Sequence, residues 1–333
     1  EDERACSAAG AALRAAVWDP IAGALAGSQR VFVVPDGEIA LVPFHALPAV
    51  RGGYLVERGP VLQLLGSELD LLPAVQAEPG KGMLALGDPD FEGAAPAVAP
   101  QLLAAAFRGE RPPCDAFRSW HWSRLPGTGE EARAIAALWD ATGPAHPAEL
   151  RLADEATEAA LRTLAPGHRI VHVATHGFFL DEHCHGAQPG ARGVGGVVRE
   201  GATALDSTAA TGSAAPGSTL RLAGLVLAGA NRRDSSADAA DDGILTAEEV
   251  ATLDLGAARW VVLSACETGV GDVQVGAGVT GLRRAFRAAG AGTLVLSLWS
   301  VSDRATLEWM QALYTAHLGR GLGDPAECAG SNL

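Results

Sequence analysis

One histidine and one cysteine stand out because each follows a short apolar run typical of a buried strand. His176 comes after the run 170–174, and Cys266 comes shortly after the run 260–263. Ligands of an open parallel sheet collect beyond the carboxyl ends of its strands. If these two strands are neighbours, about 4.8 Å apart, the imidazole and the thiol can converge on one substrate carbonyl.

The chemistry that such a pair predicts is acyl transfer through a thioester. A cysteine thiol has a pKa of about 8.5, and its thiolate is a strong nucleophile. A histidine can accept the thiol proton and later protonate the leaving amine. Gly177 has no Cβ to obstruct its backbone N–H, so the N–H groups of Gly177 and Cys266 are natural donors to an oxyanion. Each residue type is also common in a purely structural role, a buried cysteine above all, so the residues alone leave both interpretations open.

The elements around this pair predict an α/β fold. Apolar strand patterns at 83–86, 169–174, 222–228, 260–263 and 293–298 alternate with helical patterns at 130–139, 155–164, 276–289 and 303–317. This alternation predicts a mostly parallel sheet with helices on both faces. Thr128 and Glu131 have the spacing of a capping box that opens the first of these helices, and Thr246 and Glu249 have the same spacing.

The region before this pattern predicts a small α+β segment at residues 1–80. We expect a helix at 5–17, a strand at 31–34, a hairpin turn at Asp36 and Gly37, a return strand at 39–42, and a further strand at 54–65. Residues 81–333 are expected to form the main domain. Within it, residues 184–219 are mostly Gly, Ala, Ser and Thr, which predicts a long loop insert.

Composition argues against several kinds of partner. The net charge of −14 disfavours broad binding to nucleic acid, because an acidic surface repels phosphate backbones. No apolar run approaches the roughly 18 residues of a membrane span. The five scattered cysteines make a poor disulfide framework, which favours a reducing, cytoplasmic compartment. We expect no cofactor and no metal, because thiol and imidazole chemistry needs neither.

Two other patterns suggest different chemistry but fit it poorly. Gly276 to Gly281 matches the dinucleotide pattern G-x-G-x-x-G, yet residues 267–275 separate it from the preceding strand, whereas the pattern requires the first glycine directly after the strand. The run His183 to His185 hints at a metal site, but three adjacent residues cannot easily point at one ion.

Several motifs in order along the chain resemble the CHAT-domain family, over roughly residues 30 to 320. They are Val33–Gly37, Leu41–Phe44, Val171–Gly177, Asp242–Glu249, Val261–Gly269, Gly281–Phe286 and Ser297–Asp303. The resemblance implies a caspase-like, separase-related cysteine peptidase in which His176 and Cys266 match the dyad. It also implies a specific protein substrate and an upstream tetratricopeptide-repeat sensor or activator, since several members act in bacterial defence or programmed cell death. The alternative is a caspase-like module that binds a partner without turnover.

The substrate pocket is where the chain departs from related arginine-specific enzymes. Those relatives place an aspartate two residues before the nucleophile, a position that Ser264 occupies here. Asp88 and Asp303 are the carboxylates that could hold a basic side chain instead, although carboxylates at such places also serve as caps. Trp299 is expected to wall the substrate cleft.

Overall fold

The computed structural model describes residues 3–36, 39–40, 42–71, 78–93, 117, 120–143, 145–180, 219–233, 241–266, 276–297 and 303–319. These residues fall into two compact units, residues 3–71 and residues 78–319. No helix in this described part of the chain is both long and apolar enough to cross a membrane.

The first unit is built around one short parallel strand pair. It contains α1 (Glu3–Val17), α2 (Asp19–Ala22), β1 (Arg30–Val33), η2 (Phe44–Ala46), α3 (Leu55–Arg58), β2 (Val61–Leu64) and η3 (Glu68–Leu71). Its buried core comprises Trp18, Val31, Val42, Phe44, Leu47, Leu55 and Leu62.

The expected return strand is wrong, because residues 39–40 form a 3₁₀ turn; Gly37 of the expected hairpin turn lies outside the described residues. β1 pairs instead with β2 in parallel, from Arg30 with Val61 onward. Parallel strands need a crossover rather than a tight turn, and η2 and α3 form part of that connection. The strand expected at 54–65 therefore divides into α3 and β2. Glu57 contributes to this division, since its carboxylate accepts the Tyr54 N–H at 2.9 Å at the start of α3.

The second unit contains a seven-stranded mixed sheet, which confirms the predicted α/β fold. Its strands are β3 (Met83–Pro89), β4 (Ala148–Ala153), β5 (Ile170–Phe179), β6 (Ala223–Val226), β7 (Ile244–Thr246), β8 (Trp260–Cys266) and β9 (Thr293–Leu296). Five strands are parallel, in the spatial order β4-β3-β5-β8-β9. β4 and β7 were not predicted from the sequence. The strand expected at 222–228 is the short β6, which pairs antiparallel with β5 and β7.

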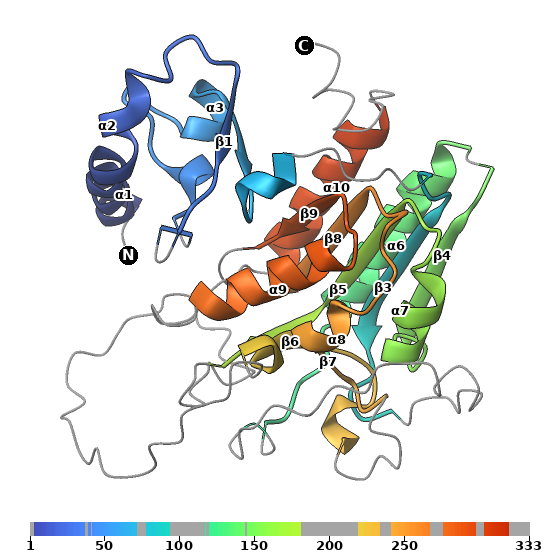
Figure 1. The fold of residues 1–333 in the computed structure, drawn as a ribbon. Coiled ribbons are helices and arrows are strands. Elements are labelled where there is room, and N and C mark those ends of the chain that lie inside the picture. Colours follow the sequence, from blue (N-terminus) through green and yellow to red (C-terminus); the bar gives the residue numbers. More distant parts are fainter. Residues whose placement is uncertain are drawn as a thin grey trace, which may run out of the picture. The chain divides into compact units, whose positions relative to one another are not determined.

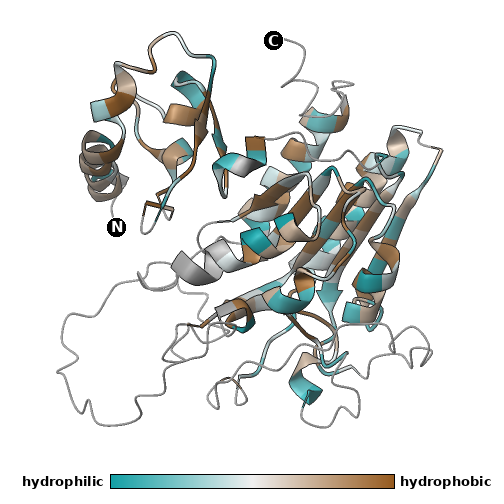
Figure 2. Ribbon diagram, viewed as in Figure 1, coloured by the Kyte–Doolittle hydropathy of each residue, from teal (hydrophilic) through white to brown (hydrophobic). Residues whose placement is uncertain are grey.

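Helices cover both faces of this sheet (Figure 1). They are α6 (Pro126–Ala141), α7 (Glu158–Leu164), α8 (Ala247–Val250), α9 (Gly276–Ala288) and α10 (Asp303–Gly319), with the 3₁₀ turns η4 (Thr219–Arg221) and η5 (Ala230–Arg232). On the α6 and α10 side, the core includes Met83, Ala132, Ile170, Val262 and Met310. The central strands are apolar along their length (Figure 2), as expected of strands that are buried on both faces.

The first helix of this unit does not begin with the expected capping box. It begins at Pro126, where a missing N–H costs nothing because the first helical N–H groups have no partner within the helix. The Thr128 hydroxyl donates to the Leu125 carbonyl at 2.7 Å and accepts the Asp88 N–H at 2.8 Å, so it joins the helix to β3 instead. The capping box of Thr246 and Glu249 is confirmed, at the start of α8.

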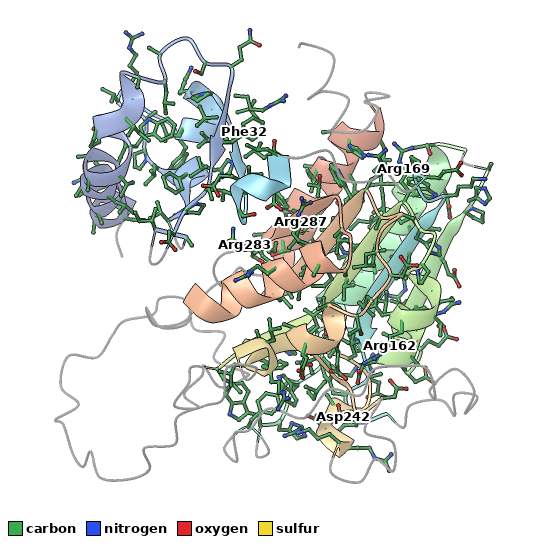
Figure 3. The ribbon with its side chains drawn as sticks, viewed as in Figure 1. Phe32, Arg162, Arg169, Asp242, Arg283 and Arg287 are labelled. Atoms are coloured by element: carbon green, nitrogen blue, oxygen red, sulfur yellow. The ribbon has the colours of Figure 1, made fainter. Side chains whose placement is uncertain are left out.

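A buried ionic network anchors β7 and α8 to α7. The Arg162 guanidinium donates to Glu158 at 2.9 Å and to Glu249 at 3.0 Å, and Glu158 also accepts the Gly243 N–H at 2.9 Å. Arg162 and Asp242 of this region are labelled in Figure 3. Burial, followed by the nearby charges of Glu249 and Asp242, raises the pKa of Glu158 well above its ordinary value. The Asp242–Glu249 motif therefore has a clear scaffolding role.

Candidate active site

His176 and Cys266 are register partners on neighbouring parallel strands. The pairing of β5 with β8 runs from Ile170 with Trp260 to His176 with Cys266. Neighbouring strands lie about 4.8 Å apart, and paired residues of a parallel ladder occupy the same face. The sheet therefore places the two positions side by side, at the last rung of this ladder.

The two strands end differently from what the sequence predicted. Cys266 is the last residue of β8 rather than a residue beyond the strand. His176 lies inside β5 and not after its end, because β6 continues the sheet there and pairs Val226 with His176. β3 pairs with one edge of β5 as far as Gly87 and Ala174, and β6 pairs with the same edge beyond that point.

The His176 ring is oriented by a backbone carbonyl. Its Nε2 lies 2.9 Å from the Ser123 oxygen, and its ring centroid lies 5.5 Å from that of Phe91. A carbonyl oxygen only accepts hydrogen bonds, so Nε2 must carry the proton. In the neutral ring, the unprotonated nitrogen is then Nδ1, which is the nitrogen able to accept a proton.

The backbone N–H of Gly177 points toward β8, the strand that carries Cys266. The Leu180 N–H donates to Leu222 at 2.7 Å, on the β6 side. Backbone N–H directions alternate along a strand, so the N–H of Gly177, three residues earlier, faces β8. This N–H therefore belongs to the β5–β8 ladder, where it pairs with β8 at the rung of His176 and Cys266.

The segment that supplies the Ser123 carbonyl is fixed by two side chains from η5 and its C-cap. Asn231 accepts the Trp122 N–H and donates to the Trp122 carbonyl, each at 2.9 Å. The buried Arg233 donates to the Trp120 carbonyl at 2.9 Å and places its guanidinium 4.9 Å from the Trp122 ring. The part of this segment in the site was not predicted from the sequence.

Asp88 already has a partner within the chain. It is the penultimate residue of β3, with a left-handed φ of 45°. Its carboxylate accepts Arg124 Nη2 at 2.6 Å and Nε at 3.2 Å, a two-point ion pair. Of the other residues expected to bind substrate, Asp303 begins α10 with its side chain outside the described residues, and Trp299 lies outside them altogether.

A second histidine supports the site from within the core. His172 lies four residues before His176, on the same face of β5. Its Nε2 is 3.1 Å from the Glu131 carboxylate of α6, and its Nδ1 is 3.2 Å from the Tyr314 hydroxyl of α10. Burial and the nearby Glu131 raise the pKa of Tyr314 well above its ordinary value. This network ties both helices to the strand that carries His176.

The two competing patterns, the histidine run and the glycine run, lie in different parts of the chain. Within the described ranges, no three His, Cys, Asp or Glu side chains are grouped to hold a metal ion. The run His183 to His185 lies outside those ranges. Gly276 to Gly281 forms the first part of α9 rather than a strand-to-helix turn.

Comparison with known families agrees with the resemblance that the motifs suggest. The model of the CHAT domain matches residues 7–328, nearly the whole chain. No curated protein matches the sequence. A match of this extent, on an α/β fold with a mostly parallel sheet, shows that the chain belongs to the CHAT domain family, a family of caspase-like peptidases.

Proposed function

We propose that the protein is a cysteine endopeptidase that cleaves a specific protein partner, with Cys266 as nucleophile and His176 as acid–base. The observation that carries this proposal is the register pairing of His176 with Cys266 at the last rung of the β5–β8 ladder. Membership of a caspase-like peptidase family supports it.

The reaction would run through a thioester. The Cys266 thiol gives its proton to Nδ1 of His176, and the thiolate attacks the carbonyl carbon of the peptide bond. The tetrahedral oxyanion would be held by the backbone N–H groups of Gly177 and Cys266, once the end of β8 moves away from β5 and releases them from the ladder. His176 then protonates the leaving amine, and a water molecule that gives a proton to His176 hydrolyses the thioester.

The contact between His176 and Ser123 supports this assignment of the proton. Donation from Nε2 to the Ser123 carbonyl leaves Nδ1 with the lone pair that the thiol proton requires. The same bond stabilises the imidazolium formed during attack, because a charged donor strengthens a hydrogen bond to a carbonyl. Few other side chains could both donate to the Ser123 carbonyl and accept the thiol proton.

The regulation we propose follows the family resemblance. An upstream repeat sensor or an activator protein would release the peptidase toward its partner, in defence or programmed cell death. The rival function is a binding module of the same fold without turnover, and thiol reactivity separates the two.

The test is labelling by a peptide-based acyloxymethyl ketone, followed by mass spectrometry of the labelled residue. We expect modification at Cys266, its loss in Cys266→Ala, and slow labelling in His176→Gln. Cys6→Ala is the matched cysteine control, since Cys6 is exposed in α1. His45→Gln is the matched histidine control, because the His45 Nε2 also lies 2.9 Å from a backbone carbonyl. Equal labelling of Cys266 in wild type and His176→Gln would refute the dyad.

The same variants, incubated with proteins encoded beside this chain, test the partner. Wild type should cut one of them at a defined bond and Cys266→Ala should not. Stable binding of a partner by both, without cleavage by either, would favour the binding module.

A further inference from the structure

The ion pair of Arg124 and Asp88 presents its positive half to solvent. Two hydrogen bonds, at 2.6 and 3.2 Å, join the guanidinium to the carboxylate. The Arg124 side chain is 48% exposed, whereas that of Asp88 is 13% exposed. A molecule that approaches this pair therefore meets the guanidinium first.

The pair lies next to the residues that orient His176. Arg124 directly follows Ser123, whose carbonyl accepts the His176 ring, and Asp88 lies three residues before Phe91, which packs against that ring. Gly87 of β3 is paired with Ala174 of β5. The next residue of β3, Asp88, therefore lies about one residue before the level of His176.

Asp88 also lies on the face of the sheet that carries His176. A Cβ added to Gly129, in the first turns of α6, would stand 2.9 Å from the Asp88 Cβ, so the two backbones pack closely. α6 packs on the face of the sheet that carries His172, and His176 lies on the same face. The Asp88 N–H is held by the Thr128 hydroxyl at 2.8 Å, which fixes the strained backbone from which the carboxylate projects.

We propose that Arg124 is a specificity-determining residue that closes this site to lysine and arginine side chains of the substrate. The inference rests on the proposed peptidase function. The chain supplies its own guanidinium to the carboxylate that would otherwise bind a basic side chain. A basic substrate residue would have to displace a two-point pair and would meet like charge at the surface. Cleavage therefore occurs next to a neutral or acidic residue.

A binding experiment that needs no turnover tests the pocket. Agmatine, a small guanidinium compound, is titrated by calorimetry into wild type, Arg124→Ala and the double variant Arg124→Ala with Asp88→Asn. We expect binding only to Arg124→Ala, because only this variant exposes an uncompensated Asp88 carboxylate. Arg304→Ala is the matched control, since Arg304 pairs with Glu308 at 3.2 Å on the exposed surface of α10.

Two results would overturn the inference at this stage. One is agmatine binding to wild type as tight as to Arg124→Ala. The other is the absence of binding to a folded Arg124→Ala, judged by circular dichroism. If that variant does not fold, Arg124→Gln takes its place, because a neutral amide also leaves the Asp88 charge unpaired.

Peptide probes that differ only in the residue before the reactive group test specificity. Wild type should react at Cys266 about tenfold faster with leucine or aspartate probes than with an arginine probe, and Arg124→Ala should gain about tenfold toward the arginine probe. Fastest reaction of wild type with the arginine probe would overturn the specificity inference and leave the peptidase intact. If Cys266 reacts with no probe in any variant, the proposed peptidase function fails, whatever the agmatine titration shows.

Discussion

A substitution of Gly243 by alanine should destabilise the protein through a steric clash and not only through backbone strain. Gly243 has a left-handed φ of 82°, and a Cβ there would stand 2.6 Å from the Ala230 Cα and 2.8 Å from the Ala228 oxygen. The left-handed conformation costs an L-residue about 1–2 kcal/mol. Overpacking adds about 1–3 kcal/mol, so Gly243→Ala should lose about 2–5 kcal/mol in total.

Gly167 is the matched control for this substitution. Its φ is also 82°, but a Cβ there would meet nothing within 4 Å. Gly167→Ala should therefore lose only the strain cost, and Gly243→Ala should melt about 2–12 °C below it. Thermal unfolding followed by far-ultraviolet circular dichroism measures the difference. Equal melting temperatures would refute the reasoning, because they would show that η5 moves aside without cost.

Three further predictions concern the supports of the site. Asn231→Ala removes the acceptor of the Trp122 N–H and should lower the free energy of unfolding in urea by about 1–3 kcal/mol. On the peptidase proposal, kcat should fall by a larger factor than KM changes. An unchanged kcat would contradict the role of this segment. Tyr314→Phe removes the hydroxyl beside His172 and should also lower the free energy of unfolding by about 1–3 kcal/mol. Urea unfolding measures this loss, and an unchanged stability would contradict it. Glu158→Gln tests a carboxyl whose folded pKa lies above its ordinary 4.5. Because the folded state then binds the extra proton, wild type should lose stability relative to Glu158→Gln as pH rises from 4.5 through the raised pKa; a parallel pH dependence of the two melting temperatures would contradict the raised pKa.

The positions of the main strands along the chain could be predicted from the sequence because parallel strands buried on both faces are continuous apolar runs. The run 260–263 and the helix after residue 276 are confirmed as parts of β8 and α9. β4 was missed because its residues are only half-buried and charged Glu149 and Arg151 interrupt the pattern. The hairpin at Asp36 was wrong because a local turn signal says nothing about a partner strand further along the chain, here Val61–Leu64.

The support of the candidate site was less predictable. Ser123 acts through its carbonyl, which every residue type possesses, so no side-chain pattern marks it. Asn231 meets Trp122 across 109 positions of the chain, and Arg124 meets Asp88 across 36. Such contacts come from the way the sheet and α6 bring distant segments together, and only the folded chain shows them.

The pairing of β5 on both of its edges at His176 has a mechanical consequence. Val226 is paired with this histidine on one side and Cys266 on the other, and the strand continues to Phe179. A residue clamped in this way cannot shift its backbone without breaking two ladders at once. β8, by contrast, stops at Cys266. A switch of the proposed peptidase that moves a residue would therefore need the least free energy at the Cys266 end of β8, with the His176 ring as the stationary reference point.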